Sequence, residues 1–243
     1  MPAIPAWPPR ALPRLFVDQP LSAGVALSLE GKPAHYLGNV LRLGEGNGVL
    51  LFNGRDGEWG ALIRAAGKKR LDLETVEQTG PLEILPPLTL AFALVKRAPL
   101  EWLIEKATEL GVARLQPVVT QRTVVERLNL ERLRLIAIEA AEQCGRTRLP
   151  ELADAVRLEQ LLERGEGRLL LADETGGVPL LSALGEGATT ILIGPEGGFT
   201  PEERSRVLDA GAVSVSLGPR ILRAETAALA ATSLYMAGAG DWR

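Results

Sequence analysis

This chain is poor in the residues that build metal sites and covalent cross-links. Its 243 residues include one cysteine, Cys144, and one histidine, His35. A single cysteine excludes an intramolecular disulfide framework and a zinc site of several thiolates, and it is typical of a reducing compartment, so we expect a cytoplasmic protein. A single histidine leaves no histidine cluster and no Ser-His-Asp relay. We therefore expect no metal site, and chemistry based on carboxylates, Arg, Lys, backbone groups or a bound cofactor.

Several sequence signatures are also missing. No G-x-G-x-x-G segment follows an apolar run and no G-x-x-x-x-G-K-[ST] segment occurs, which excludes the usual dinucleotide fingerprint and the phosphate loop of nucleotide hydrolases. Residues 1–14 carry five prolines in place of a long apolar core. We therefore expect an extended arm there, and neither a signal peptide nor a membrane span.

Positive charge is scarce overall, because the formal net charge is −3. That balance alone argues against a nucleic-acid partner, since phosphate binding usually accompanies an excess of Lys and Arg. The distribution is uneven, however. Residues 96–148 carry an excess of three positive charges and residues 149–243 an excess of six negative charges. A local basic surface is therefore compatible with the acidic total.

The residues that are present predict two domains. Residues 1–80 contain short apolar runs separated by Gly, Asn and Asp, which predicts a small β-barrel with one helix at 34–43. Prolines and glycines at 79–87 mark a boundary, and strands then alternate with helices, which predicts an α/β domain with a mostly parallel sheet over 81–243. Its strands are expected at 88–95, 116–120, 168–172, 191–193 and 213–217, and its helices at 99–110, 130–144, 201–210 and 225–237.

Two apolar runs near the C-terminus end in loops rich in Gly and Pro. Residues 191–193 lead into Gly194-Pro195-Glu196-Gly197-Gly198, and residues 213–217 lead into 218–226. Ligands of open α/β sheets bind outside the carboxyl ends of the strands, so we expect both loops to line one pocket. Two consecutive glycines let a flat ligand approach the backbone closely, and Glu196 favours a neutral or cationic ligand.

The two helices that follow these loops begin differently. Thr200, Pro201 and Glu203 have the spacing of a capping box, which predicts a helix that starts at residue 201. Arg223 and Glu225 flank the entry to an Ala-rich helix. Such a pair is most often a solvated surface feature, but its place beside the expected pocket favours a functional role.

These two loops resemble the signature of the bacterial family that methylates N3 of a uridine in small-subunit (16S) ribosomal RNA, within the SPOUT methyltransferases. The resemblance continues in the segments 35–42, 106–111 and 142–146, so it covers nearly the whole chain in the expected order. It implies a PUA-like β-barrel that binds RNA and a C-terminal α/β domain with a trefoil knot. It also implies S-adenosylmethionine (SAM) as cofactor and a homodimer that acts on 16S ribosomal RNA, with the small ribosomal subunit as its context.

The resemblance also implies roles for individual residues. Cofactor contacts fall on Ile193, Gly194, Gly197, Gly198, Leu217, Gly218, Ile221, Leu222 and Thr226. We hypothesise that Arg223 stabilises negative charge on the uracil oxygen, while Glu225 either accepts the N3 proton or holds Arg223 in place. RNA contacts are expected from Arg122, Gln143, Arg146 and Arg42. Cys144 is expected to be a buried small hydrophobe.

Two other functions are compatible with the same scaffold. The first is methylation of another RNA, such as transfer RNA or 23S ribosomal RNA, which would share the cofactor site and differ in the substrate pocket. The second is a non-catalytic RNA-binding factor in ribosome assembly. The intact pairs Gly197-Gly198 and Arg223-Glu225 argue against the second, since a protein without catalysis has no chemical need for them.

Overall fold

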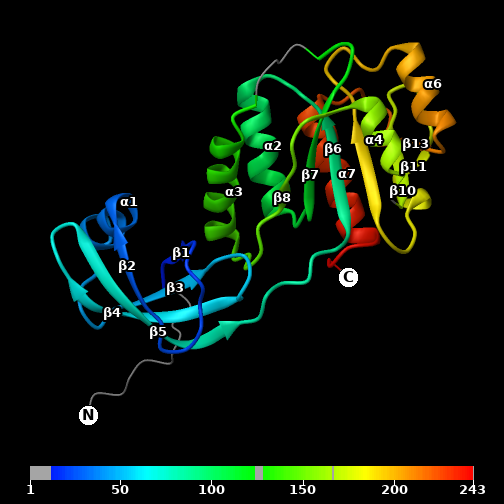
Figure 1. The fold of residues 1–243 in the computed structure, drawn as a ribbon. Helices are drawn as coiled ribbons and strands as arrows, with labels where there is room; N and C mark the ends of the chain where they lie inside the picture. Colours follow the sequence, from blue (N-terminus) through cyan, green and yellow to red (C-terminus); the bar gives the residue numbers. More distant parts are fainter. Residues whose placement is uncertain (1–11, 124–127, 166, 243) are drawn as a thin grey trace. The chain divides into compact units, whose positions relative to one another are not determined.

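The protein is described by a computed structural model that covers residues 12–123, 128–165 and 167–242. The chain divides into two compact units (Figure 1). The first consists of Met1–Ile84 with Ala141–Arg148, and the second of Leu85–Ala140 with Leu149–Arg243. Each unit has its own sheet and its own hydrophobic core.

The first unit is built on a five-stranded sheet in the order β1-β3-β4-β5-β2. Its strands are β1 (Arg14–Phe16), β2 (Ala26–Glu30), β3 (Gly48–Phe52), β4 (Glu58–Ala66) and β5 (Arg70–Gly80). β1 pairs with β3 in parallel, and the other neighbours are antiparallel. The sheet is curled (Figure 1), and among the described strands β1 and β2 remain its two edges. The expected barrel is therefore a half-barrel over this part of the chain.

Strand β5 shows how the sequence pattern builds this sheet. Leu71, Leu73 and Thr75 are at most 1% exposed, whereas Val76 is 41% exposed. Side chains alternate between the two faces of a strand, so every second residue enters the core. Thr75 also satisfies its hydroxyl, because Oγ1 accepts a hydrogen bond from the Val25 amide at 2.8 Å. Strand β5 thus buries every second residue from Leu71 to Thr75 and leaves Val76 exposed.

The helix predicted at 34–43 is partly wrong. The helical segments are α1 (Gly31–His35) and a π-helical turn, η1 (Tyr36–Val40). Leu37 is fully buried, but Tyr36, Val40 and Leu41 are exposed, so most of the expected apolar stripe does not face the core. Arg42 follows with φ +57°, the one positive φ at a non-glycine residue in the described part of the chain. The wider π turn rotates the later side chains away from the face that an α-helix would bury.

The second unit contains a parallel sheet in the order β11-β13-β10-β12-β6-β7-β8, with β9 also paired to β7. Its strands are β6 (Leu88–Ala93), β7 (Arg114–Val119), β8 (Glu151–Leu152), β9 (Val156–Arg157), β10 (Arg168–Ala172), β11 (Val178–Pro179), β12 (Thr189–Ile193) and β13 (Val213–Ser216). Its helices are α2 (Arg97–Glu109), α3 (Leu130–Cys144), α4 (Leu158–Arg164), α5 (Leu180–Ala183), α6 (Pro201–Asp209) and α7 (Ala224–Gly238).

Helices cover both faces of this sheet. On β6, Leu90 and Phe92 join the cluster that includes side chains of α2 and α7. Ala91, between them, joins a second cluster with Leu158 of α4 and Val207 of α6. Because strand side chains alternate, one apolar strand fills two cores, and the result is a three-layer α/β/α arrangement.

The chain doubles back across this sheet. β12 and β13 lie on either side of β10, so the connection through α6 passes β10. Helix α7 then returns to pack against α2, β6 and β12. Crossing the same strand twice is the arrangement that the expected trefoil knot requires. It brings the ends of β10, β12 and β13 together with the start of α7.

All nine expected elements of the second unit are present, and their ends shift by two residues at most. The short elements β8, β9, α4, β11 and α5 were not expected, because segments of two to seven residues carry too little periodicity to be recognised. Among the described helices, none combines the length and the apolarity that crossing a lipid bilayer requires.

Candidate active site

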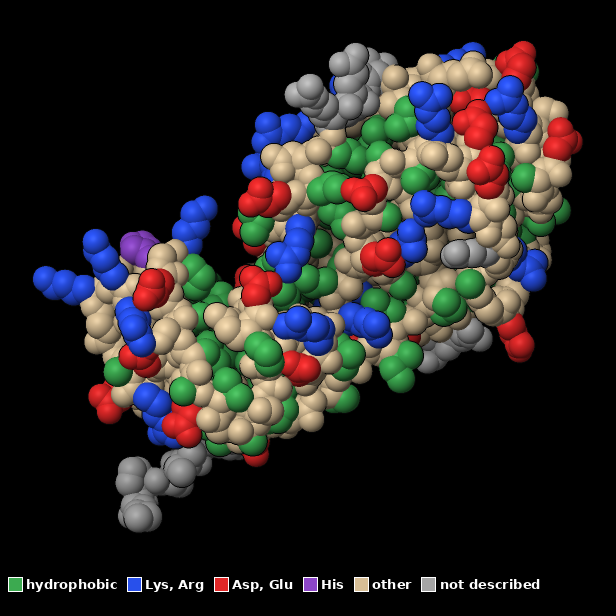
Figure 2. All heavy atoms as spheres, viewed as in Figure 1, with side chains coloured by type: hydrophobic (Ala, Val, Ile, Leu, Met, Phe, Trp, Pro, Cys, Tyr) green, Lys and Arg blue, Asp and Glu red, His purple; other side chains and the backbone are tan. Residues whose placement is uncertain are grey.

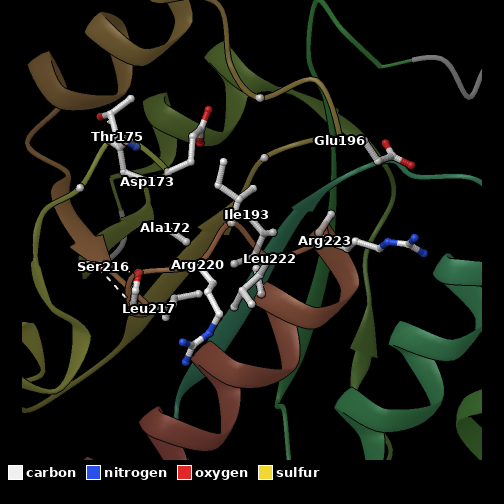
Figure 3. A pocket seen from close by; sticks show the side chains of 18 of the residues that line it. Ala172, Asp173, Thr175, Ile193, Glu196, Ser216, Leu217, Arg220, Leu222 and Arg223 are labelled. Atoms are coloured by element: carbon white, nitrogen blue, oxygen red, sulfur yellow. Dashed lines mark hydrogen bonds between the residues drawn. The ribbon is translucent and has the colours of Figure 1, made fainter.

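A cavity of about 720 Å³ opens where three strands of the parallel sheet end (Figure 3). Its walls are the segments 172–176 after β10, 193–198 after β12 and 216–224 after β13. In Figure 3 the apolar side chains of Ile193 and Leu222 lie in the middle of the site. Asp173 and Thr175 lie on one side of them, and Glu196 and Arg223 on the other. The cavity thus combines an apolar floor with charged edges.

The structure brings most of the predicted site residues to this cavity. Those that line it are Ile193, Gly194, Gly197, Gly198, Leu217, Gly218, Ile221, Leu222 and Arg223. Glu225 and Thr226, on the first turn of α7, are not among the lining residues. The expectation that the two Gly/Pro loops share one pocket is confirmed.

Sequence reasoning missed the third wall, the segment 173–176. The signal was available, because β10 was predicted and Asp-Glu-Thr-Gly-Gly follows it directly. The carboxyl ends of neighbouring parallel strands meet at one edge of a sheet, so this polar loop had to lie beside the other two. Arg220 and Ala227 also line the cavity and were not predicted.

Asp173 organises this third wall. Its carboxylate accepts hydrogen bonds from the amide and hydroxyl of Thr175 at 2.9 and 2.7 Å, from Ser214 Oγ at 2.9 Å and from Arg204 Nε at 2.8 Å. Burial by itself raises the pKa of this carboxyl, but these hydrogen bonds outweigh it and lower the pKa to about 2. Asp173 is therefore a charged anchor that joins the loop after β10 to α6 and β13.

The glycines of the loop after β12 each face a different protein group. A Cβ at Gly194 would lie 3.0 Å from the Phe199 ring, and one at Gly197 would lie 3.3 Å from Arg122 Cδ. Gly198 has φ +66°, and a Cβ there would lie 2.5 Å from Glu174 Oε1. Glycine adopts the positive φ of Gly198 without strain, and at all three positions it avoids the displacement of a neighbour that a Cβ would cause.

The start of α6 confirms the predicted capping box. Thr200 Oγ1 accepts from the Glu203 amide at 3.2 Å, and Glu203 Oε2 accepts from the Thr200 amide at 3.0 Å. Glu203 is 2% exposed, and its other oxygen, Oε1, accepts from the amide of Gln121 at 2.7 Å. One carboxylate therefore caps α6 and also binds the loop that follows β7.

The two charged residues predicted to act in catalysis are placed differently. Arg223 is the N-cap of α7, is exposed and lines the cavity. Glu225 is partly buried on the first helical turn and does not line it. Glu196 also lines the cavity, and in Figure 3 its carboxylate lies on the same side of the site as the Arg223 guanidinium.

The segment 142–146 contributes to packing more than was expected. Glu142 Oε1 accepts from the Phe16 amide at 2.9 Å. The Arg146 side chain is 4% exposed and lies 3.6 Å from Glu83, so it is not accessible to RNA in this structure. Gln143 is exposed. The prediction for Cys144 is wrong, because its thiol belongs to an exposed residue just before the turn at Gly145.

The remaining residues predicted to contact RNA are at the surface. Arg42 and Arg122 are both exposed. Arg122, however, donates from Nη1 to the carbonyl oxygen of Gly197 and, at 3.5 Å, to that of Phe199. Positive and negative side chains are interspersed over the face shown in Figure 2. In the described residues, no group of three or more His, Cys, Asp and Glu side chains could hold a metal ion.

Comparison with known proteins defines the class to which this fold and site belong. Residues 83–236 match the family model of an RNA methyltransferase domain, and residues 29–76 match that of an RNA methyltransferase PUA domain. The protein is thus a two-domain RNA methyltransferase, with a PUA domain and a methyltransferase domain whose cavity lies at the carboxyl ends of the sheet.

Relatives identify the family within this class. The chain is 35% identical over 225 residues to ribosomal RNA small subunit methyltransferase E of Rickettsia conorii, covering 90% of this chain and 92% of that protein. It is 32% identical to the Bacillus subtilis protein of the same name, covering 90% and 94%. The chain belongs to the family of ribosomal RNA small subunit methyltransferases E, so the family predicted from its motifs is confirmed.

Solved structures agree with this assignment. The Neisseria gonorrhoeae ribosomal RNA small subunit methyltransferase E, bound to SAM, has a TM-score of 0.86 and 30% identity, covering 96% of this chain and 100% of that chain. A putative methyltransferase from Legionella pneumophila, also in complex with SAM, has a TM-score of 0.85 and 32% identity, covering 95% and 99%.

Proposed function

We propose that this protein uses SAM to methylate N3 of a uridine in 16S ribosomal RNA. The observation that carries the proposal is the cavity formed by the loops after β10, β12 and β13, which gathers most of the predicted cofactor contacts in a member of this family. Relatives named for the small ribosomal subunit and neighbours solved with SAM support the same substrate and cofactor.

The residues that line the cavity fit SAM. Gly194, Gly197 and Gly198 line the cavity without side chains of their own, so a flat ring system can approach the main chain there. Glu174 and Glu196 supply negative charge for a cationic ligand, and Ile193 and Leu222 supply an apolar surface. When bound there, SAM supplies an activated methyl group on a sulfonium sulfur.

The substrate determines what the protein's own groups must do. Uridine N3 carries a proton, so it becomes an effective nucleophile only when that proton leaves. We assign to Arg223 the stabilisation of the negative charge that develops on the uracil oxygen. A carboxylate would take the N3 proton and later pass it to water. The methyl group that N3 receives would leave its sulfonium sulfur, which keeps the electron pair of the broken C–S bond as a neutral thioether. Glu196 lines the cavity, so it is the better candidate for proton acceptance, and Glu225 is better suited to holding Arg223.

The wider context of the reaction follows from the same proposal. Arg42 and Gln143 are exposed and remain candidates for RNA contacts. Thr226 remains a candidate for a cofactor contact, because its neighbours Ala224 and Ala227 line the cavity. We propose that the protein is a homodimer that acts on 16S ribosomal RNA within the small ribosomal subunit. Since ribosomal subunits are its substrate, we place its activity in the cytoplasm.

The direct test is methyl transfer from labelled SAM to small ribosomal subunits taken from cells that lack this protein. Mass spectrometry of the digested RNA is expected to show 3-methyluridine. Label in transfer RNA or 23S ribosomal RNA instead would replace the proposed substrate by the alternative one. SAM binding without any methyl transfer to RNA would favour a non-catalytic factor.

Substitutions test the assigned roles. Arg223→Ala is expected to lower kcat by about 100-fold or more, the effect of removing a group that stabilises transition-state charge, with little change in the Kd for SAM. Glu196→Gln is expected to lower kcat more than Glu225→Gln. Near-normal turnover by both Arg223→Ala and Glu196→Gln would refute these roles.

A further inference from the structure

Arg122 lies in the turn at 120–123 that follows β7, and its side chain is directed at the loop after β12. Its Nη1 group donates to the carbonyl oxygens of Gly197 and Phe199. Its Cδ atom lies so close to Gly197 that a Cβ there would be 3.3 Å away. The side chain therefore covers one of the two consecutive glycines that shape the cavity wall.

A second contact fixes the same two loops together. The amide of Gln121 donates to Glu203 Oε1 at 2.7 Å, and Glu203 in turn holds Thr200 at the start of α6. The loop after β7 thus contacts the 194–203 segment near its middle, through Arg122, and at its far end, through Gln121. Thr120 and Thr123 close the turn at 120–123, since the Thr120 amide donates to Thr123 Oγ1 at 2.9 Å.

The surroundings of Arg122 suit a residue that holds these two loops together better than one that binds phosphate. Its guanidinium donates to carbonyl oxygens. The pKa of Glu202 is lowered, mainly by hydrogen bonds at the start of α6 and in small part by the charge of Arg122. A guanidinium already engaged with carbonyls and near a carboxylate attracts a phosphate less than a free one does. We propose that Arg122 is a positioning residue that sets the shape of the Gly197-Gly198 turn, and hence the affinity for SAM, and that it is not an RNA ligand.

This inference rests on the proposed function only in taking SAM as the ligand of the cavity. It predicts that charge alone cannot replace Arg122. A lysine keeps the positive charge, but its side chain is shorter and ends in an ammonium group, so it does not reproduce the reach of Arg122 Nη1 to the two carbonyl oxygens. At a phosphate contact, by contrast, lysine is a serviceable substitute, because it acts there as a point charge.

The test measures SAM binding and RNA binding separately on the full-length protein. Isothermal titration with SAM, without RNA, is expected to give a Kd about tenfold higher for both Arg122→Ala and Arg122→Lys, the loss of one charged hydrogen bond. Filter binding of 16S ribosomal RNA transcribed in vitro is expected to give an unchanged Kd and an unchanged dependence on salt. The matched control is Arg206→Ala, which removes an exposed partner of Glu159 on the same unit and should alter neither.

The opposite pattern would overturn the inference. If Arg122→Ala left the Kd for SAM unchanged but weakened RNA binding and lowered its salt slope by about one, Arg122 would be a phosphate ligand. Restoration of RNA binding by Arg122→Lys would also identify a phosphate ligand. Melting temperatures without SAM check that both variants are folded, and if Arg122→Ala fails to fold, Arg122→Lys decides. If wild type itself bound no SAM, the proposed function would fail. If wild type and Arg122→Ala bound SAM with the same Kd, the inference about Arg122 would fail and the proposed function would stand.

Discussion

Replacement of Asp173 by asparagine isolates the charge that holds the third wall of the cavity. The amide can still accept from Thr175, but its NH₂ group would face two donors, Arg204 Nε and Ser214 Oγ. The native carboxyl has a pKa of about 2 against an ordinary value of 3.8. At about 1.4 kcal/mol per unit, the ionised form stabilises the folded state by about 2 to 3 kcal/mol.

The sign of this shift fixes the pH dependence. Because the folded-state pKa lies below the unfolded one, the stabilisation is complete above pH 3.8 and is lost as the pH falls through 2. Asparagine does not titrate. Urea unfolding followed by circular dichroism should therefore show Asp173→Asn less stable than wild type by about 2 to 3 kcal/mol at pH 7 and pH 5, and by about half as much at pH 3.

A matched carboxylate provides the control. Glu159 pairs with Arg206 at 2.8 Å, but both side chains are more than half exposed, so Glu159→Gln should cost less than about 0.5 kcal/mol at any of these pH values. A difference between wild type and Asp173→Asn that stayed constant from pH 7 to pH 3 would refute the reasoning, since the charge would then not be its source. Weaker SAM binding is expected to accompany the loss of stability, because Asp173 lines the cavity.

Three further predictions concern single positions. Gly198→Ala should lower stability by about 1 kcal/mol, because residue 198 has a positive φ, and it should also weaken SAM binding, because its Cβ would meet Glu174. The control is Gly187→Ala, which has φ +87° and no atom within 4 Å of its Cβ, and which should lower stability alone. Thr200→Ala should lower the free energy of unfolding by about 1 kcal/mol, measured in urea, through loss of the α6 cap. Cys144 should react with a thiol reagent in the native protein; protection until denaturation would contradict its exposure.

Long periodic elements of this fold are predictable from sequence, and short ones are not. Helix α3 and strand β10 were predicted at their observed bounds, since each has enough residues to show its period. The helix at 34–43 failed because its apolar spacing fits an α-helix, whereas the backbone adopts a π turn that the spacing does not encode. The double crossing of β10 depends on the path of the whole chain, so no local pattern predicts it. The knotted topology was expected here only because the sequence resembles a known family.

The site was predictable where a motif coincides with the end of a strand. Gly197 and Arg223 both satisfy that condition and both line the cavity. Arg146 and Cys144 do not follow a strand. From residue type an arginine is expected at the surface and a cysteine in the interior, but Arg146 is buried against Glu83 and Cys144 is exposed. Tertiary packing, rather than residue type, decides burial for an isolated residue at or near the end of a helix.

The glycines of the loop after β12 are needed for packing within the protein as well as for any contact with a ligand. Gly194, Gly197 and Gly198 each face a protein side chain at a distance that leaves no room for a Cβ without a shift. The motif would therefore be needed to pack Phe199, Arg122 and Glu174 even in the absence of any ligand. These glycines are therefore needed for the shape of the cavity even where they make no contact with a ligand. Variants of these glycines should alter the SAM site whether or not SAM touches the substituted residue.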